Sequence, residues 1–178
     1  MTVSANRFRD VLGRLAGGVC VVTACDPDGG PRGLTATAVC SVSLEPPLLL
    51  ACLAGDSRTH RAIEISGHYA VNFLGAGDQE LAERFAGDEE DKFSGLEPTT
   101  GRTGAPLLAG ALGYCDCVVI DRVVAGDHTV FIGRVEAAGT LAATRASGSA
   151  SPLLRYCGSY ATVGQAVEIE EEASGDGA

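Results

Sequence analysis

The sequence predicts a mainly β domain with flanking helices, of the α+β class, in which short antiparallel strands form a barrel. Two observations carry this prediction. Six or so segments have the length and the apolar or alternating pattern of strands, and turn residues of hairpin type join most of them. Three other short segments have apolar residues at helical spacing. At 178 residues the chain suits one domain, which we expect over residues 1–165.

The first element expected is a helix over residues 7–16. Phe8, Val11, Leu12 and Leu15 recur there at the spacing of one helix face, and two glycines then end the pattern. This helix, with its apolar stripe, is expected to be the first element of the domain.

Strands follow this helix. The apolar residues 19–24 predict a buried strand, and the turn residues 26–30 join it to a second arm at 34–43. Residues 48–53 are apolar throughout, which predicts a central strand covered on both faces.

The second arm alternates small apolar residues with polar ones. Because a strand points successive side chains to opposite faces, one face carries a row of hydroxyls from Thr35, Thr37, Ser41 and Ser43. We interpret this row as a candidate ligand surface. The alternative is a solvated β face rich in threonine, and the strand alone does not decide between the two.

The remaining elements follow in order. Helical patterns occupy residues 57–65 and 78–86, with a strand at 69–74 between them. Two longer strands are expected at 113–124 and 129–138, joined by a tight turn.

The end of the chain has three parts. A connection rich in serine, alanine and glycine covers residues 143–151, and a final apolar segment covers 152–160. Residues 166–178 are acidic, and we expect them to be a disordered tail.

Composition excludes several classes of function. The net charge is −10, and an acidic chain without a basic stripe and without tryptophan argues against a nucleic-acid partner. No apolar run reaches the roughly 18 residues that cross a bilayer, and the first residues do not resemble a secretory signal. We therefore expect no membrane segment and a cytoplasmic location. The seven cysteines lack zinc-site spacing, and His60 and His68, which we expect to be surface or capping groups, lack a third ligand at suitable spacing. No metal site is therefore expected.

Ser57, Arg58 and Thr59 begin the expected helix at 57–65 with two hydroxyls and a cation. A helix start offers unpaired N–H groups and partial positive charge, which bind anions such as phosphate. An ordinary cap beside a solvated arginine is the alternative. A Rossmann site is not expected elsewhere, because the glycine pair at 75–77 is followed by Glu80 where the dinucleotide fingerprint needs its third glycine.

A set of short motifs occurs in a fixed order along the chain. They are Gly-Leu-Thr-Ala-Thr-Ala at 33–38, Ser-Val-Ser-Leu-Glu-Pro-Pro at 41–47, Ser-Arg-Thr-His at 57–60, Val-Asn-Phe at 71–73, Asp-Lys-Phe at 91–93, Gly-Asp-His-Thr-Val-Phe-Ile-Gly-Arg-Val at 126–135 and Pro-Leu-Leu-Arg-Tyr at 152–156. Each motif is weak alone. The ordered set resembles the short-chain NAD(P)H:flavin oxidoreductase family over roughly residues 7–162.

The resemblance implies a fold, ligands and partners. Members fold as an antiparallel FMN-binding split β-barrel, usually as a homodimer, and bind FMN or FAD. Many are the reductase components of two-component monooxygenases, which take NADH or NADPH as hydride donor and pass reduced flavin to the oxygenase. Many relatives have Asn and Ser in the third and fourth places of the first motif, where this chain has Thr37 and Ala38, so the choice between FMN and FAD stays open.

The resemblance also implies site residues, all of them for binding. Thr35, Ala36, Thr37 and Ala38, with Ser41 and Ser43 farther along, would line the isoalloxazine and ribityl chain; Ser57, Arg58 and Thr59 would hold the phosphate; Asp91, Lys92 and Phe93 would form a loop near the flavin; Asp127 and His128 would meet the nicotinamide nucleotide, with Tyr156 near the same opening.

The expected reaction needs no catalytic side chain, because hydride transfer is the chemistry of the two cofactors and the protein holds their rings together. No nucleophile elbow is present. Two other functions remain open at this point. One is a non-catalytic flavin- or haem-binding split-barrel protein, and the other is a purely structural dimerisation domain.

Overall fold

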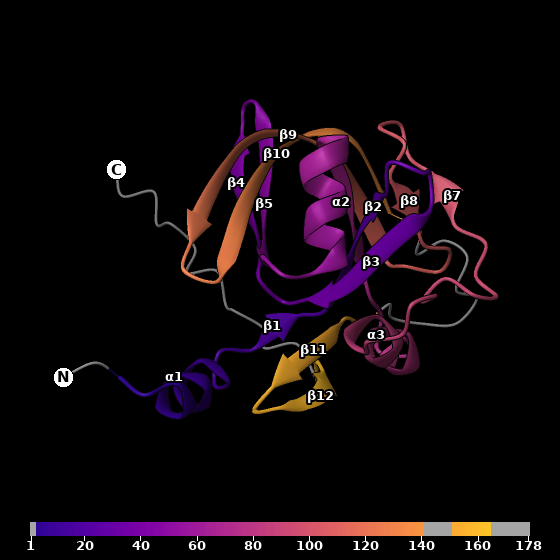
Figure 1. Cartoon of the computed structure of the whole chain (residues 1–178). Helices are drawn as coiled ribbons and strands as arrows, with labels where there is room; N and C mark the ends of the chain where they lie inside the picture. The colour runs from indigo at the N-terminus through magenta and orange to yellow at the C-terminus, as the bar shows by residue number, and fades with distance from the viewer. Residues whose placement is uncertain (1–2, 141–150, 165–178) are drawn as a thin grey trace, which may run out of the picture.

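The computed structural model describes residues 3–140 and 151–164. Within them the chain forms three short helices and one large antiparallel sheet with two small ones (Figure 1). The helices are α1 (Ala5–Leu12), α2 (Arg58–Ser66) and α3 (Gln79–Ala86). The predicted α+β class with mainly β content is confirmed. The expected acidic tail at 166–178 and nearly all of the connection at 143–151 lie outside the described residues.

The large sheet has seven strands in the order β3-β2-β6-β9-β10-β5-β4. These strands are β2 (Cys20–Cys25), β3 (Pro31–Ala36), β4 (Val39–Leu44), β5 (Pro47–Ala54), β6 (His68–Phe73), β9 (Gly113–Ala125) and β10 (His128–Thr140). The small sheets are β1 (Gly17–Gly18) with β11 (Leu153–Tyr156) and β12 (Ser159–Thr162), and β7 (Thr99–Thr100) with β8 (Pro106–Leu107). In the described residues β3 and β4 stand at the two ends of the strand order, but only Thr37 and Ala38 separate them in the chain, so the sheet curls round until its two ends meet, as the expected barrel requires.

The single strand expected at 34–43 is wrong. The structure has two strands there, β3 and β4, which lie at opposite edges of the large sheet. β3 pairs with β2, whereas β4 pairs with β5, so at Thr37 and Ala38 the chain passes from one strand pair to the other where the curled sheet brings the two pairs together. The hydroxyls of this segment therefore do not form one continuous row, because the two halves belong to different strand pairs.

β5 is not covered on both faces as expected. Leu49, Ala51 and Leu53 are buried, while the side chains between them are only half-buried. β5 lies next to β4 at one end of the strand order, and its second face stays half-buried in the described chain. A continuous apolar run thus does not distinguish a covered strand from a half-covered one.

Two hydrophobic cores lie on the two faces of β2. Cys20, Val22 and Ala24 belong to the first core, with Ala62 and Ile63 of α2. The second core contains Val19 and Val21, with Ala82 and Phe85 of α3 and Leu153 of β11. In Figure 1, α2 stands between β5 and the β2–β3 hairpin, and α3 lies beside β3. This packing brings the start of α2 and the end of α3 to the free edge of β3.

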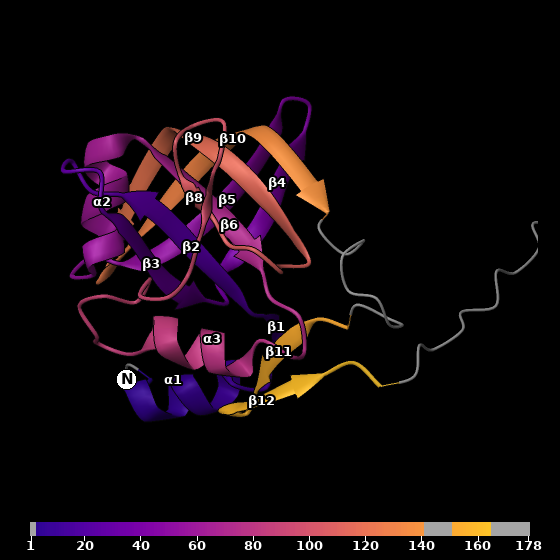
Figure 2. The same ribbon diagram turned by 90° about the vertical axis from the view of Figure 1, so that its right-hand side faces the viewer.

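α1 packs differently from the other helices, because none of its residues is buried. Phe8, Val11, Leu12 and Leu15, which were expected to form an apolar stripe, are all exposed in the described chain. Figures 1 and 2 show α1 outside the large sheet, on the same side as β11 and β12. The backbone N–H of Cys157 donates to the carbonyl of Gly13 at 2.7 Å and holds α1 against that hairpin.

Candidate active site

Three cavities meet around the start of α2. The first, which we call the helix-end cavity, has a volume of about 340 Å³ and lies between β3, the first turn of α2 and the segment that follows α3. Its lining residues are Pro31, Arg32, Gly33, Leu34, Asp56, Ser57, Arg58, Thr59, Gly87, Asp88, Glu89, Glu90, Lys92 and Phe93.

The second, the strand-edge cavity, has a volume of about 420 Å³. It lies along the free edge of β3 and is lined by residues 34–38 and 52–54, Ser57, residues 85–88, Lys92 and His128. An edge strand presents backbone N–H and C=O groups that no neighbouring strand uses. This cavity therefore offers a row of backbone donors and acceptors to the polar edge of a flat ligand.

The third, the hairpin cavity, has a volume of about 610 Å³ and lies at the turn between β9 and β10. Its lining comprises residues 54–56, His60, Glu64, Val124 and residues 126–129. It shares Ala54 and His128 with the strand-edge cavity, which in turn shares Leu34, Ser57, Gly87, Asp88 and Lys92 with the helix-end cavity. The three cavities thus form one continuous site with His128 at one junction and Ser57 at the other.

Ser57 is the N-cap of α2. Its Oγ accepts a hydrogen bond from the backbone N–H of His60 at 3.1 Å. A hydroxyl also has its own proton to donate, so Ser57 can cap the helix and still bind an anion in the cavity. Thr59, in the same turn, is only 3% exposed and lines the same cavity. The cap reading and the phosphate reading of this turn are therefore compatible.

Lys92 and Phe93 close the helix-end cavity from the other side. The Lys92 Nζ donates to the carbonyl of Phe85 at 2.9 Å, and Phe93 packs edge-on against the Phe85 ring with centroids 5.0 Å apart. Burial lowers the pKa of Lys92, and so does Arg58, whereas the carboxylates of Asp88 and Glu89 raise it. A bound phosphate would favour the charged ammonium of Lys92 in the same way.

The turn between β9 and β10 positions His128. Ala125 pairs with His128, which leaves a two-residue turn in which Gly126 has φ +65°, a conformation that favours glycine. The Asp127 Oδ1 lies 2.7 Å from the His128 Nδ1, and this hydrogen bond lowers the pKa of Asp127. Because a carboxylate only accepts, Nδ1 carries the proton and Nε2 of the neutral ring is left as an acceptor.

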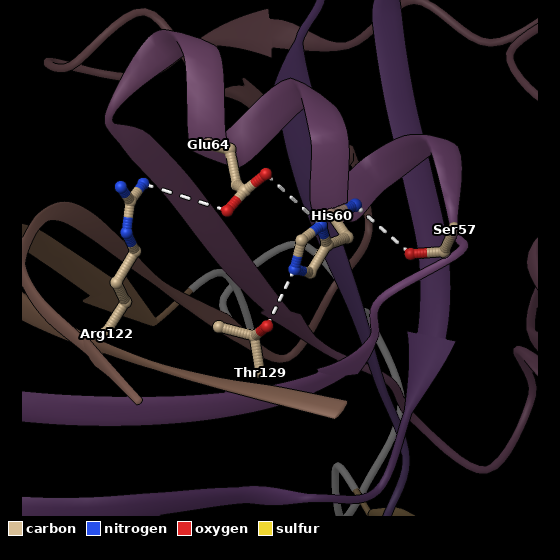
Figure 3. A network of polar contacts seen from close by, with 5 residues as sticks. All are labelled: Ser57, His60, Glu64, Arg122 and Thr129. Atoms are coloured by element: carbon tan, nitrogen blue, oxygen red, sulfur yellow. Dashed lines mark hydrogen bonds and ion pairs between the residues drawn. The ribbon is translucent and has the colours of Figure 1, made fainter. Parts of the chain in front are cut away.

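His60 lines the hairpin cavity, and Figure 3 shows its polar contacts. Its Nε2 lies 2.8 Å from the Thr129 Oγ1, and its ring packs on Phe131 with centroids 5.1 Å apart. The Glu64 carboxylate lies 3.9 Å from the other ring nitrogen of His60, Nδ1, and 3.7 Å from the Arg122 guanidinium. We expected His60 to be a surface or capping residue, which is wrong, because it is 7% exposed.

A match to a known family decides the identity of the chain. The model of the flavin reductase like domain matches residues 12–164. The chain belongs to this family.

Several relatives of this flavin reductase-like chain are known. It is 40% identical over 161 residues to the flavin reductase (NADH) of Kitasatospora aureofaciens, covering 89% of this chain and 82% of the relative. It is 39% identical over 158 residues to HsaB of Rhodococcus jostii, the reductase subunit of a flavin-dependent monooxygenase, covering 89% and 77%. A probable flavin reductase of Rhizobium meliloti is 42% identical over 130 residues, which make up 73% of this chain and 42% of that protein.

Solved structures of similar proteins cover nearly the whole flavin reductase-like chain. A homologue of nitrilotriacetate monooxygenase component B from Mycobacterium thermoresistibile is 33% identical, with a TM-score of 0.83 over 94% of this chain and 93% of that one. The NADH:FAD oxidoreductase SgcE6 of Streptomyces globisporus is 32% identical, with a TM-score of 0.82 over 93% and 98%. Another structure of SgcE6 contains NAD and FAD fragments. These likenesses agree with the expected split-barrel fold.

The flavin reductase-like chain brings most of the expected site residues together. Those that line the three cavities are Thr35, Ala36, Thr37, Ala38, Ser57, Arg58, Thr59, Lys92, Phe93, Asp127 and His128. The Thr35 hydroxyl donates to the carbonyl of Ala82 at 2.6 Å, so it fastens α3 to β3 while its residue lines the strand-edge cavity.

Four of the expected site residues do not line these cavities. Ser41 and Ser43 lie in β4, where they pair with Leu49 and Leu48 of β5, and Tyr156 lies in the separate sheet with β1 and β12. Asp91 faces its own loop, where its Oδ1 accepts from the backbone N–H of Phe93 at 3.1 Å. Asp91 therefore shapes the segment that presents Lys92 and Phe93 to the cavity.

Sequence reasoning missed part of the lining. Arg32 and Gly33 of β3 and residues 52–54 of β5 line the cavities, although none of them is among the expected site residues; Gly33 begins the motif at 33–38, and the others lie outside the motifs. The signal for Gly33 is steric: a Cβ there would lie 2.6 Å from the Phe85 ring, so only glycine lets α3 approach β3 this closely. No comparable signal in the sequence marks Arg32, because Arg32 lines a cavity only where distant segments, such as residues 87–90, pack opposite β3.

Proposed function

We propose that this protein is an NADH-dependent flavin reductase that supplies reduced flavin to a partner monooxygenase. The observation that carries the proposal is the junction at Ala54 and His128, where the strand-edge cavity opens into the hairpin cavity. A flavin ring in the strand-edge cavity and a nicotinamide ring in the hairpin cavity would come into contact at this junction. The naming of HsaB as a monooxygenase reductase subunit supports the same role.

The flavin and the dihydronicotinamide would supply the hydride-transfer chemistry when both are bound. The contribution of the protein is to hold the reacting atoms about 3–3.5 Å apart and aligned. The free edge of β3 would bind the polar edge of the isoalloxazine ring, and Ser57, Thr59 and Lys92 would bind the phosphate. His128 would fix the nicotinamide, its Nε2 accepting from the carboxamide.

The lining of the hairpin cavity supports NADH over NADPH as the proposed donor. Three carboxylates, those of Asp56, Glu64 and Asp127, line it, and no lysine or arginine is among its described lining residues. NADPH differs from NADH by one phosphate of about −1.5 to −2 charge, and such a group is disfavoured beside carboxylates. The pyrophosphate is common to both donors, so it does not affect this preference.

The purified protein is expected to oxidise NADH only when flavin is added, with kcat/KM for NADH at least about tenfold above that for NADPH, because of these carboxylates. Steady-state assays with each donor and each flavin measure both quantities. Tight flavin binding without NADH oxidation would contradict the reductase and favour a non-catalytic flavin-binding protein. Absence of any flavin binding would favour haem binding or a purely structural domain.

We also propose that the protein is a homodimer of one domain over residues 1–165, in which a second copy covers the apolar face of α1. This placement rests on the exposure of Phe8, Val11, Leu12 and Leu15 and on the homodimer implied by the family resemblance. A cytoplasmic location fits as well, because all seven cysteines are described and free. In the described residues no helix is long and apolar enough to cross a membrane.

Phe8→Glu is expected to convert the dimer into a monomer, because it places a charge in the apolar contact of α1. Light scattering coupled to size-exclusion chromatography, repeated over a range of concentrations, measures the change. Ile65→Glu is the matched control, since Ile65 is similarly exposed on α2 (53% against 59% for Phe8). A wild-type monomer, or equal dissociation by both variants, would contradict an interface built on α1.

A further inference from the structure

The helix-end cavity is larger than one phosphate group requires. Its volume is about 340 Å³, which equals the liquid volume of about eleven waters at about 30 Å³ each, whereas a phosphate group is one phosphorus atom with its oxygens. Away from Ser57 and Thr59, its walls are residues 31–34 of β3 and residues 87–90 after α3. Room for a second part of the ligand therefore remains beside the phosphate site.

Arg32 is the cation on the β3 wall of this cavity. Its Nε is paired with the carboxylate of Asp26, and its Nη1 donates to the carbonyl of Glu90 at 3.4 Å. A guanidinium has five N–H donors in a planar fork, so these two contacts hold Arg32 in place and leave donors for a ligand. Such a fork matches the oxygens of a phosphate group.

The charges around the cavity select between kinds of phosphate. Arg32, Arg58 and Lys92 line it together with four carboxylates, those of Asp56, Asp88, Glu89 and Glu90. A terminal phosphate monoester concentrates about −1.5 to −2 charge on one group. A diphosphate diester spreads its charge over two groups, and a ribose and an adenine beyond it carry hydroxyl and amino donors that carboxylates accept. The mixed lining fits the second kind of ligand better than the first.

We propose that the flavin of this protein is FAD, that its adenylate half occupies the helix-end cavity between β3 and residues 87–90, and that Arg32 is the residue that distinguishes FAD from FMN. The proposal rests on the proposed function, because it assumes a flavin in the strand-edge cavity. FMN ends at the phosphate held by Ser57 and Thr59, so it does not extend to Arg32.

The test is equilibrium titration of FAD and of FMN into the purified full chain, followed by flavin fluorescence. The wild type is expected to bind FAD at least about tenfold more tightly than FMN, and Arg32→Gln to lower the affinity for FAD about tenfold while that for FMN changes less than about twofold. Arg102→Gln, at an exposed arginine outside the cavity, is the matched control and is expected to change neither.

A second measurement does not depend on the variant folding. Adenosine monophosphate added to the wild type is expected to displace FAD but to leave FMN bound. The proposal is overturned if FMN binds as tightly as FAD, if Arg32→Gln weakens both flavins equally, or if adenosine monophosphate displaces neither or both. Binding of neither flavin would instead overturn the proposed function itself.

Discussion

Ser57→Asp is expected to lower the affinity for flavin by more than about 100-fold while the melting temperature stays near that of the wild type. Aspartate caps a helix as well as serine does, so the hydrogen bond from the His60 N–H persists. It cannot donate to a phosphate, and its charge repels one. Loss of a charge-assisted hydrogen bond, at about 1.5–3 kcal/mol, and the added repulsion together exceed about 3 kcal/mol.

Two variants are controls for this result. Ser4→Asp makes the same change at the N-cap of α1, where the Ser4 Oγ accepts from the Arg7 N–H at 3.3 Å far from the cavities, and it is expected to leave flavin binding unchanged. Ser57→Ala removes both the cap and the hydroxyl, so it should cost about 1 kcal/mol of stability as well as affinity. Normal flavin binding by folded Ser57→Asp would remove the phosphate assignment.

His128→Ala is expected to lower kcat/KM for NADH about 100-fold and to change the flavin dissociation constant less than about threefold. His128 lines both the hairpin cavity and the strand-edge cavity, so it lies between the two ligands. Steady-state kinetics at saturating flavin and flavin titration of the same variant give the two numbers.

His128→Phe separates the ring from its nitrogen. If Nε2 accepts a hydrogen bond from the nicotinamide, His128→Phe should be nearly as slow as His128→Ala; if stacking alone matters, it should recover most of the rate. Asp127→Ala is expected to have a smaller effect, about tenfold, because it frees the ring that Asp127 holds at 2.7 Å without removing it. Equal losses for flavin and NADH in His128→Ala would contradict the assignment.

Features that depend on neighbouring residues were predictable. A cap at the start of this helix was predictable, with Ser57 or Thr59 able to supply it, and Ser57 is the residue that does, because capping joins a side chain to a backbone group three residues away. The turn at Gly126 and Asp127 was also predictable, since a two-residue hairpin needs a residue that accepts positive φ. The helix and strand patterns elsewhere were right in kind, although α1 begins and ends earlier than its apolar spacing indicated.

Features that depend on which strands pair were not predictable. The alternating pattern at 34–43 looked the same as one long strand, yet β3 and β4 pair with different partners, and Ser41 and Ser43 belong to the second of these pairs, outside the cavity linings. His60 looked like a surface residue, although packing against Phe131 buries it.

The sequence by itself determined the fold class, the start of α2 with its two hydroxyls, the turn that carries His128 and, through its ordered motifs, the family. Only the tertiary structure decided that the edge of β3, the end of α3 and residues 52–54 enclose one continuous site, and that Arg32 lies in it. The reason is physical: a cap or a turn is stabilised by contacts within a few residues, whereas a cavity is the space left when segments distant in sequence pack together.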